Sequence, residues 1–295
     1  MLKKRIILII ALLLVDLAII HGQTGSDDII VPGNSLTEKL AWLQRSADSH
    51  NTYILVVSAN ENITPHKFEF RGAVNITVVL RGDNINRTIR LRSNDRMFEV
   101  CSDVILILDN NLTLQGHSQN TGHHLVNVLG GSFIMNSGSA ITGNGGGGVW
   151  ISSGIFTMNG GTISGNTRDY GAGVKLDGGT FTMNNGTING NTASNGAGVY
   201  NSGNFTMRGG TITNNTAREY GGGVYSNGTF IKAGGIITGY NSDQSNGNAV
   251  KDDDGVLARR GHAVYVDEVR RIETTIGPDT RLNSNSSGVA GGWGN

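Results

Sequence analysis

Apolar and polar residues alternate in short runs along most of this chain. Phe181 and Met183 flank Thr182, so the two apolar side chains point to one side of the backbone and the threonine to the other. A second run is centred on Ile188, and a third covers residues 172–176. Clusters of glycine and asparagine, which turns prefer, separate the runs. A period of two therefore predicts short, half-buried strands joined by tight turns.

These runs recur along the chain. Segment 154–166 returns almost unchanged at 179–191 and again at 203–215. Apolar markers follow in steps of 22 to 25 residues at Phe133, Phe156, Phe181, Phe205 and Phe230, at Ile141, Ile163, Ile188, Ile212 and Ile237, and at Val149, Val174, Val199 and Val224. A repeat of this length is too short for a pair of helices and fits one coil of three short strands.

We therefore predict an all-β fold, a right-handed parallel β-helix with coils of about 25 residues and a short N-terminal capping helix. Stacking coils at roughly 4.8 Å places each marker on its counterpart in the next coil. The right hand follows from the general preference of parallel crossovers. The 45 glycines alone would suggest a flexible Gly/Asn-rich tract, but a disordered tract does not require phased Phe, Ile and Val.

The two ends of the chain depart from the repeat. Residues 1–22 join a basic start to an apolar run, the pattern of a secretory signal peptide, with an uncleaved N-terminal anchor as the alternative. A linker and a capping helix fill residues 23–52. The helix is predicted over 35–46, where Ser35 and Glu38 form a capping box. The remaining chain divides into irregular early coils (53–128), regular coils (129–239), an inserted loop (240–260), and a final coil with a C-terminal tail (261–295).

Composition narrows the classes of partner. The 23 basic and 23 acidic residues cancel, which leaves no electrostatic case for nucleic acid or an anionic membrane. The single cysteine, Cys101, cannot form an internal disulfide and fits a small buried apolar residue. We expect a monomer without a cofactor, in contact with a membrane only through residues 1–22 if these are not cleaved.

The inserted loop holds a weak candidate for a metal site. Asp252, Asp253 and Asp254 supply clustered oxygens of the kind that calcium prefers. They lack the alternate spacing and the closing glutamate of an EF-hand loop. His262, which precedes a core strand, is expected to be structural.

Two carboxylates are the candidates for catalysis. Asp169 and Glu219 occupy the same turn position two coils apart, which corresponds to roughly 10 Å. Glycoside hydrolysis needs two carboxyl groups about 5–10 Å apart. The coil between them has Ser194 and Asn195 at that position and therefore adds no acid to the pair. Two solvated charges in turns are the simpler interpretation.

An outward row of aromatic residues is the best candidate for a binding surface. The position after each marker valine holds Trp150, Lys175, Tyr200, Tyr225 and, later, Tyr265. Exposed aromatic rings on a rigid face can stack on sugar rings or bind a protein partner. The alternative is lateral stacking of the rings on one another, which needs no ligand.

Two phrases of the repeat resemble a known group of proteins. The Phe-x-x-Asn phrase at 133–136, 156–159 and 181–184 and the Gly-Ala-Gly-Val phrase at 171–174 and 196–199 resemble repeats of bacterial polymorphic outer-membrane adhesins. From about residue 35 onward, the chain is similar to exported bacterial right-handed β-helix repeat proteins, with which it shares the phrases at 39–44, 156–166, 261–266 and 291–293. The chain departs from the pattern at Arg208 and Ala233, which replace the asparagine. The resemblance implies an exported solenoid and supplies no activity.

The sequence thus predicts an exported, non-enzymatic, adhesin-like binding protein of the bacterial cell surface, the extracellular space or the periplasm. Its expected partner is a glycan, or a host or cell-surface protein. Two alternatives stay open. One is a polysaccharide-active enzyme, a glycoside hydrolase or lyase that uses Asp169 and Glu219. The other is a structural spacer or antigenic coat without a ligand.

Overall fold

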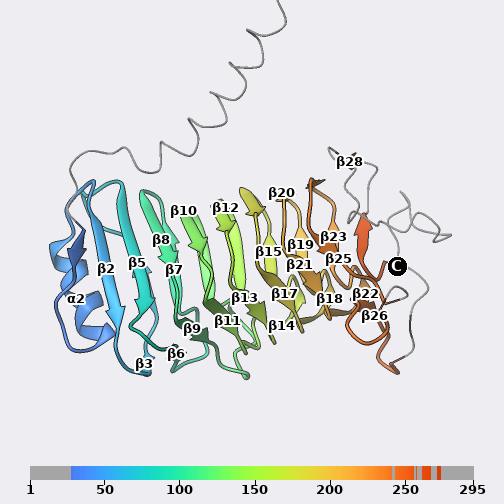
Figure 1. The fold of residues 1–295 in the computed structure, drawn as a ribbon, viewed down its shortest axis with the longest axis horizontal. Coiled ribbons are helices and arrows are strands. Elements are labelled where there is room, and N and C mark those ends of the chain that lie inside the picture. The colour runs from blue at the N-terminus through green and yellow to red at the C-terminus, as the bar shows by residue number, and fades with distance from the viewer. Residues whose placement is uncertain (1–27, 241–242, 256, 258–260, 267–270, 274–295) are drawn as a thin grey trace, which may run out of the picture.

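The chain folds into a parallel β-solenoid of about eight turns, whose coils stack along one axis (Figure 1). A computed structural model describes residues 28–240, 243–255, 257 and 261–266, and the backbone of 271–273. The predicted all-β solenoid, with coils about 25 residues apart and a helix at its N-terminal end, is confirmed. The predicted signal peptide or anchor at 1–22 and most of the C-terminal tail lie outside the described residues.

Sheet A has 16 strands and consists of two columns, because most coils contribute two strands to it. The leading column contains β4 (His66–Phe68), β7 (Phe98–Cys101), the first halves of β10 (Val126–Met135) and β12 (Val149–Met158), β15 (Val174–Leu176), β19 (Val199–Asn201), β23 (Val224–Ser226) and β27 (Val264–Val266). The trailing column contains β1 (Ile29–Ile30), β2 (Thr52–Val57), β5 (Ile76–Gly82), β8 (Val104–Leu108), the second halves of β10 and β12, β16 (Thr180–Met183), β20 (Asn204–Met207), β24 (Thr229–Lys232) and β28 (Arg271–Glu273).

Two smaller sheets close the coil. Sheet B has eight strands: β3 (Glu61–Ile63), β6 (Arg87–Leu91), β9 (Leu112–Gln115), β11 (Ser139–Thr142), β13 (Thr162–Ser164), β17 (Thr187–Asn189), β21 (Thr211–Thr213) and β25 (Ile236–Ile237). Sheet C has four strands: β14 (Thr167–Tyr170), β18 (Thr192–Asn195), β22 (Thr216–Tyr220) and β26 (Ala249–Val250). The regular coils therefore contain four strands, where the sequence predicted three, because sheet C occupies a segment that was predicted as a turn.

The core consists of identical residues stacked from coil to coil. Phe156, Phe181 and Phe205 are in register and fully buried, and successive ring centroids lie 4.7 Å apart with nearly parallel planes. The marker isoleucines of sheet B and the marker valines of the leading column stack in the same way. Stacked burial of this kind supplies most of the apolar stabilisation of a solenoid.

A ladder of buried asparagines follows sheet B in each regular coil. The backbone N–H of Asn166 donates to Oδ1 of Asn191 over 3.0 Å, and Asn191 donates in the same way to Asn215. Asn215 donates to Asn248, so the ladder continues into the segment 240–260. Each side chain thus satisfies backbone and side-chain groups that have no access to water.

Segment 240–260, predicted as one inserted loop, contains part of a coil. Asn248 extends the asparagine ladder, and β26 pairs in parallel with Thr216 and Ala217 of β22. Among the described residues on either side of β26, Asn248 forms an isolated bridge with Gly239, and Lys251 forms one with Leu257. The sequence signal was present, because Asn248-Ala249-Val250 matches the Asn-x-apolar phrase that begins at Asn215.

The Gly-Ala-Gly-Val phrase reflects close approach between coils. A Cβ atom on Gly198 would clash with the carbonyl oxygen of Gly223 in the next coil and press against Ile212. Gly196 has a φ of 60°, a left-handed conformation that glycine adopts without strain. The phrase therefore marks the turn that connects sheet C to the leading column.

Helix α2 (Leu36–Ser46) covers the first coil (Figure 1). Ser35 is its N-cap, and its hydroxyl accepts a hydrogen bond from the backbone N–H of Glu38. The carboxylate of Glu61 in β3 accepts the N–H of Leu36 over 2.9 Å, which fixes the start of the helix to the solenoid. No helix among the described residues has the length and apolar character needed to cross a membrane.

Candidate functional site

The outward positions of the leading column form one row across eight coils. The strand register gives the order Lys67, Glu99, Asn127, Trp150, Lys175, Tyr200, Tyr225 and Tyr265. The register therefore confirms that Trp150, Lys175, Tyr200, Tyr225 and Tyr265 share one row on the outside of the solenoid. It also extends this row by three polar positions toward the N-terminus.

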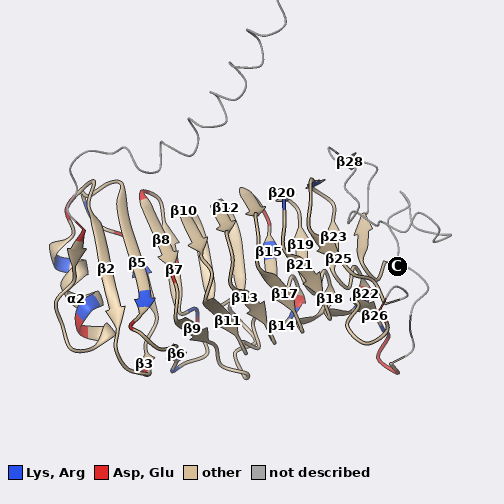
Figure 2. Ribbon diagram, viewed as in Figure 1, with Lys and Arg blue, Asp and Glu red and all other residues tan. Residues whose placement is uncertain are grey.

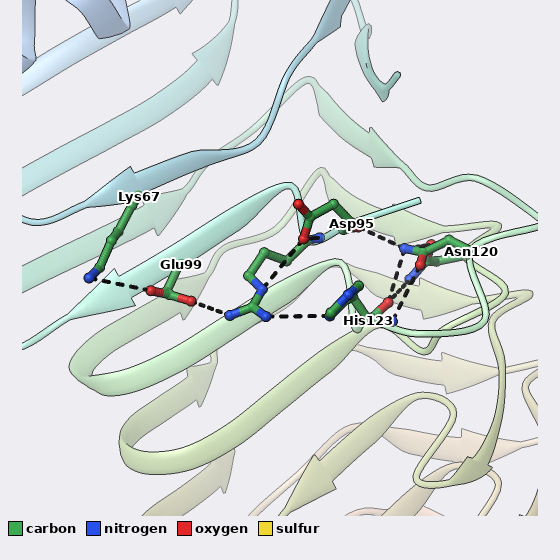
Figure 3. A network of polar contacts seen from close by, with 7 residues as sticks. Lys67, Asp95, Glu99, Asn120 and His123 are labelled. Atoms are coloured by element: carbon green, nitrogen blue, oxygen red, sulfur yellow. Dashed lines mark hydrogen bonds and ion pairs between the residues drawn. The ribbon is translucent and has the colours of Figure 1, made fainter. Parts of the chain in front are cut away.

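The N-terminal part of the row belongs to a network of polar side chains (Figure 3). Glu99 lies 3.7 Å from the Lys67 ammonium and also forms an ion pair with Arg96. Arg96 in turn contacts Nδ1 of His123, at 3.4 Å from Nη2. Asn120 donates to the backbone carbonyl of Asp95 over 2.7 Å and to that of His123 over 3.1 Å. These contacts fix the connection between β9 and β10 onto the face of the leading column.

Trp150 is held by polar partners on the next coil. Its indole N–H donates to the Asp177 carboxylate over 2.8 Å, and the Lys175 ammonium lies 2.6 Å from the same oxygen. The ammonium also lies 5.4 Å from the centre of the Trp150 ring, within the range of a cation–π contact. The buried His124 ring lies 6.3 Å from the indole. Trp150 is therefore fixed in place and half-buried.

The three tyrosines of the row stack on one another. The rings of Tyr200 and Tyr225 are 4.9 Å apart and 7° from parallel, and those of Tyr225 and Tyr265 are 5.5 Å apart and 11° from parallel. A stacked ring covers the face of its neighbour, so the lateral stacking considered as the alternative is present. What a partner meets is therefore mainly the edges of these rings.

Two further tyrosines from sheet C flank the row. The Tyr170 ring meets Tyr200 edge to face at 5.4 Å, and the Tyr220 ring lies 4.5 Å from Tyr265. Tyr170 is 47% exposed, more than any other aromatic residue described. We call Trp150, Tyr170, Tyr200, Tyr220, Tyr225 and Tyr265 together the aromatic face. In the sequence both flanking tyrosines directly follow Asp169 and Glu219, at the position predicted as a turn, so the predicted row did not include them.

A shallow polar pocket of about 170 Å³ lies over sheet C, and its lining residue Asp169 directly precedes Tyr170 of the aromatic face in β14. Hydroxyl groups, two arginines and Asp169 line it, with Thr121, Gly145, Thr167, Arg168, Asp169, Thr192, Ala193, Ser194 and Arg218 as the full set. Arg168 is anchored by a 2.8 Å hydrogen bond to the carbonyl of Thr121, and Arg218 lies 3.4 Å from Asp253. Donors and acceptors in such a pocket match the hydroxyl groups of a polar ligand.

The structure places the two candidate acids differently from the sequence prediction. Asp169 and Glu219 lie on β14 and β22, not in a turn. Ser194 faces both Arg218 and Glu219, because Ala193 pairs with Ala217 while Asn195 pairs with Tyr220. This β-bulge shifts Glu219 out of register with Asp169. Glu219 accepts a hydrogen bond from Asn195 over 3.0 Å and is not among the residues that line the pocket with Asp169.

The aspartates of the inserted segment form a turn. The carboxylate of Asp252 accepts the N–H of Asp254 over 3.1 Å, and Asp253 faces Arg218. Among the described residues, no group of three or more Asp, Glu, His or Cys side chains is arranged to hold a metal ion. Nδ1 of the buried His262 accepts the N–H of Val250 over 2.8 Å, which is a structural contact.

Comparison with family models, with curated proteins and with solved structures found no match to this chain. The resemblance to outer-membrane adhesin repeats therefore rests on the repeat phrases alone, whereas the β-solenoid is shown by the structure.

Proposed function

We propose that this chain is an exported, non-catalytic binding protein of the cell surface or periplasm, and that its aromatic face binds a glycan chain. The observation that carries the proposal is the position of Tyr170. This exposed ring contacts the stacked tyrosines, and its neighbour in β14, Asp169, lines the polar pocket. An exposed aromatic ring beside hydroxyl, guanidinium and carboxylate groups is suited to the mixed apolar and polar surface of a sugar.

The arrangement supports binding more than hydrolysis. A glycosidase needs its two carboxyl groups on either side of one scissile bond. Here Glu219 bonds to Asn195, and the pocket beside it contains Asp169 as its one acid. The polysaccharide-active enzyme and the spacer without a ligand are retained as outcomes of the test.

The test is a glycan and polysaccharide array that records both retention of the purified protein and released reducing ends. We expect retention without product, and at least a tenfold loss of retention in the Tyr200→Ser/Tyr225→Ser double variant. The matched control is Thr182→Ser/Thr206→Ser, which changes the trailing column on β16 and β20. Circular dichroism of each variant checks that the solenoid is folded.

Each other outcome leads to a different function. Release of reducing ends, abolished by Asp169→Asn or Glu219→Gln, would overturn the non-catalytic proposal. Absence of both retention and product would contradict a glycan partner and favour a protein partner or a spacer. Equal retention by the tyrosine variant and the control would show that the glycan binds elsewhere on the molecule.

A further inference from the structure

The outward side chains of the trailing column form two uncharged rows. The first row contains Thr52, Thr77, Ile105, Ser132, Ile155, Thr180, Asn204 and Thr229. The second contains Ile30, Ile54, Val79, Ile107, Ile134, Thr157, Thr182, Thr206 and Ile231. In Figure 2 the ribbons of β2 and β5 are accordingly tan over most of their length.

Aliphatic residues gather in the N-terminal part of these rows. Five consecutive positions of the second row are isoleucine or valine, and Ile105 and Ile155 of the first row lie beside them. We call this set the aliphatic stripe: Ile30, Ile54, Val79, Ile105, Ile107, Ile134 and Ile155. Ile30, Ile105 and Ile155 are 58%, 36% and 48% exposed, Val79, Ile107 and Ile134 are half-buried, and Ile54 is buried at 7%. An exposed cluster of this kind on a soluble protein marks an interaction surface.

The strands beneath the stripe have the composition of strands covered on both faces. β8 reads Val-Ile-Leu-Ile-Leu without a polar residue. Its inward side chains, Val104, Leu106 and Leu108, are buried in the solenoid. Parallel sheets with such continuous apolar runs are usually packed on both sides. Here the solenoid core packs the inner face of β8, whereas on its outer face Ile105 is exposed and Ile107 is half-buried.

The other outward faces carry charge. The leading row contains Lys67, Glu99 and Lys175, and sheet B presents Arg90. The trailing rows can therefore approach an identical surface without like-charge repulsion or buried unpaired charge. The next outward position of β5 is Arg81, which would lie at the rim of such a contact, where polar residues are usual.

We propose that the aliphatic stripe is the contact surface of a homodimer, in which two solenoids pack trailing column against trailing column. A second copy is the partner whose apolar side chains have the same rung spacing, roughly 4.8 Å, so the two pleated faces can interdigitate about 10 Å apart. A contact between the same surface on both copies also gives a closed two-fold dimer. This inference does not rest on the proposed function.

The area of the trailing-column face determines the expected stability of the dimer. Eight rungs at roughly 4.8 Å and about four residues of strand width give about 500 Å² per copy, or about 1,000 Å² in total. This is near the lower limit for a specific interface, so the dimer should be reversible and dependent on concentration. It would replace the monomer predicted from the sequence once the protein is concentrated.

Sedimentation velocity of the full chain over a hundredfold range of concentration tests the proposal. We expect the mean mass to rise toward that of a dimer. Ile105→Lys/Ile155→Lys should weaken the dimer at least tenfold, because it places four ammonium groups in the contact. The matched control, Thr142→Lys/Thr187→Lys on sheet B, should behave like the wild type. Ile105→Thr/Ile155→Thr gives a milder test, since threonine already occupies this row at Thr77 and Thr180.

Circular dichroism and thermal unfolding of each variant separate loss of the dimer from loss of the fold. A wild-type chain that stays monomeric at every concentration would overturn the proposal. So would a dimer that persists in both the lysine and the threonine variants. Monomers that bind vesicles of neutral phosphatidylcholine through the stripe, and lose this binding in the lysine variant, would assign it to a lipid surface instead.

Discussion

At the scale of single residues, His124 is a buried histidine beside the aromatic face whose burial disfavours its protonation. Its ring is buried beside Trp150, and its Nε2 lies 3.4 Å from the carbonyl of Gly171. Burial lowers the pKa of His124 to about 3, and the nearby charges of Arg168 and Lys175 act in the same direction. Burial also lowers the pKa of His66, to about 4. Both side chains are therefore neutral in the folded protein at neutral pH.

The folded protein should lose stability as the pH falls from about 6.5 toward 3. In this window an unfolded histidine, with a pKa near 6.5, takes up a proton that the buried His124 does not, so protons favour the unfolded chain. Above pH 6.5 neither state binds the proton, and this contribution to the pH dependence vanishes. We expect His124→Asn to reduce the loss of unfolding free energy between pH 7 and pH 4, as measured by urea denaturation.

His50, an exposed histidine near the start of the solenoid, provides the control. His50→Asn should leave the pH dependence of unfolding close to that of the wild type. If the unfolding free energy depends on pH equally in the wild type and in His124→Asn, the buried ring is not the source of the loss of stability at low pH.

At the scale of elements, the asparagine ladder connects one coil to the next. Oδ1 of Asn191 accepts the backbone N–H and the side-chain amide of Asn166, while its own amide donates to Oδ1 of Asn215. We expect Asn191→Ala to lower the free energy of unfolding by about 2–4 kcal/mol, because it leaves buried donors and acceptors without partners. Urea denaturation measures the change.

Asn189 is the matched control, because it lies in the same coil and points outward from β17. Asn189→Ala should change the unfolding free energy by less than about 0.5 kcal/mol. If both variants lose the same stability, the ladder is not the source of the effect.

The elements that repeat most closely are those that the sequence predicted. Phe181, Ile188 and Val174 recur in register because each must fill the same space in its coil, and the helix from Ser35 follows from its cap and its apolar stripe. In the early coils the apolar runs at 53–57, 76–80, 88–91 and 104–108 predict β2, β5, β6 and β8, whereas β3, β4 and β7 were missed, since these coils vary in length and composition. Sheet C was missed because its inward residues are small, as at Ala193 and Ala217, and give a weak apolar signal.

At the scale of the whole molecule, the candidate site could be predicted only in part. The row from Trp150 to Tyr265 followed from the repeat, because a fixed register carries outward positions from coil to coil. The contribution of Tyr170 and the shift of Glu219 could not be predicted from the repeat, because both depend on the sheet C strands and their bulge. Four of the seven residues of the aliphatic stripe lie in the early coils, where apolar residues on both faces of a strand obscure which face is buried.

The ends of a solenoid determine whether it associates end to end with other molecules. Leu36, Leu40 and Leu43 of α2 are buried against the first coil. Without this cover, the first coil would present apolar side chains and unpaired strand edges to other molecules. We expect Leu40→Ser/Leu43→Ser to lower stability by several kcal/mol, about 2–5 for each site by analogy with truncations of buried leucine. The variant should also form large assemblies.

These assemblies differ from the proposed dimer in size and in the surface they use. Association through an uncovered end adds further molecules along the solenoid axis, so size-exclusion chromatography with light scattering should detect species well above a dimer. The lysine pair on the aliphatic stripe should not prevent this growth, because it changes a side of the solenoid and not its end. Ala41→Ser, on the exposed side of α2, should elute like the wild type. A leucine variant that stays no larger than a dimer would show that α2 is dispensable as a cap, and that the strands of the first coil protect themselves.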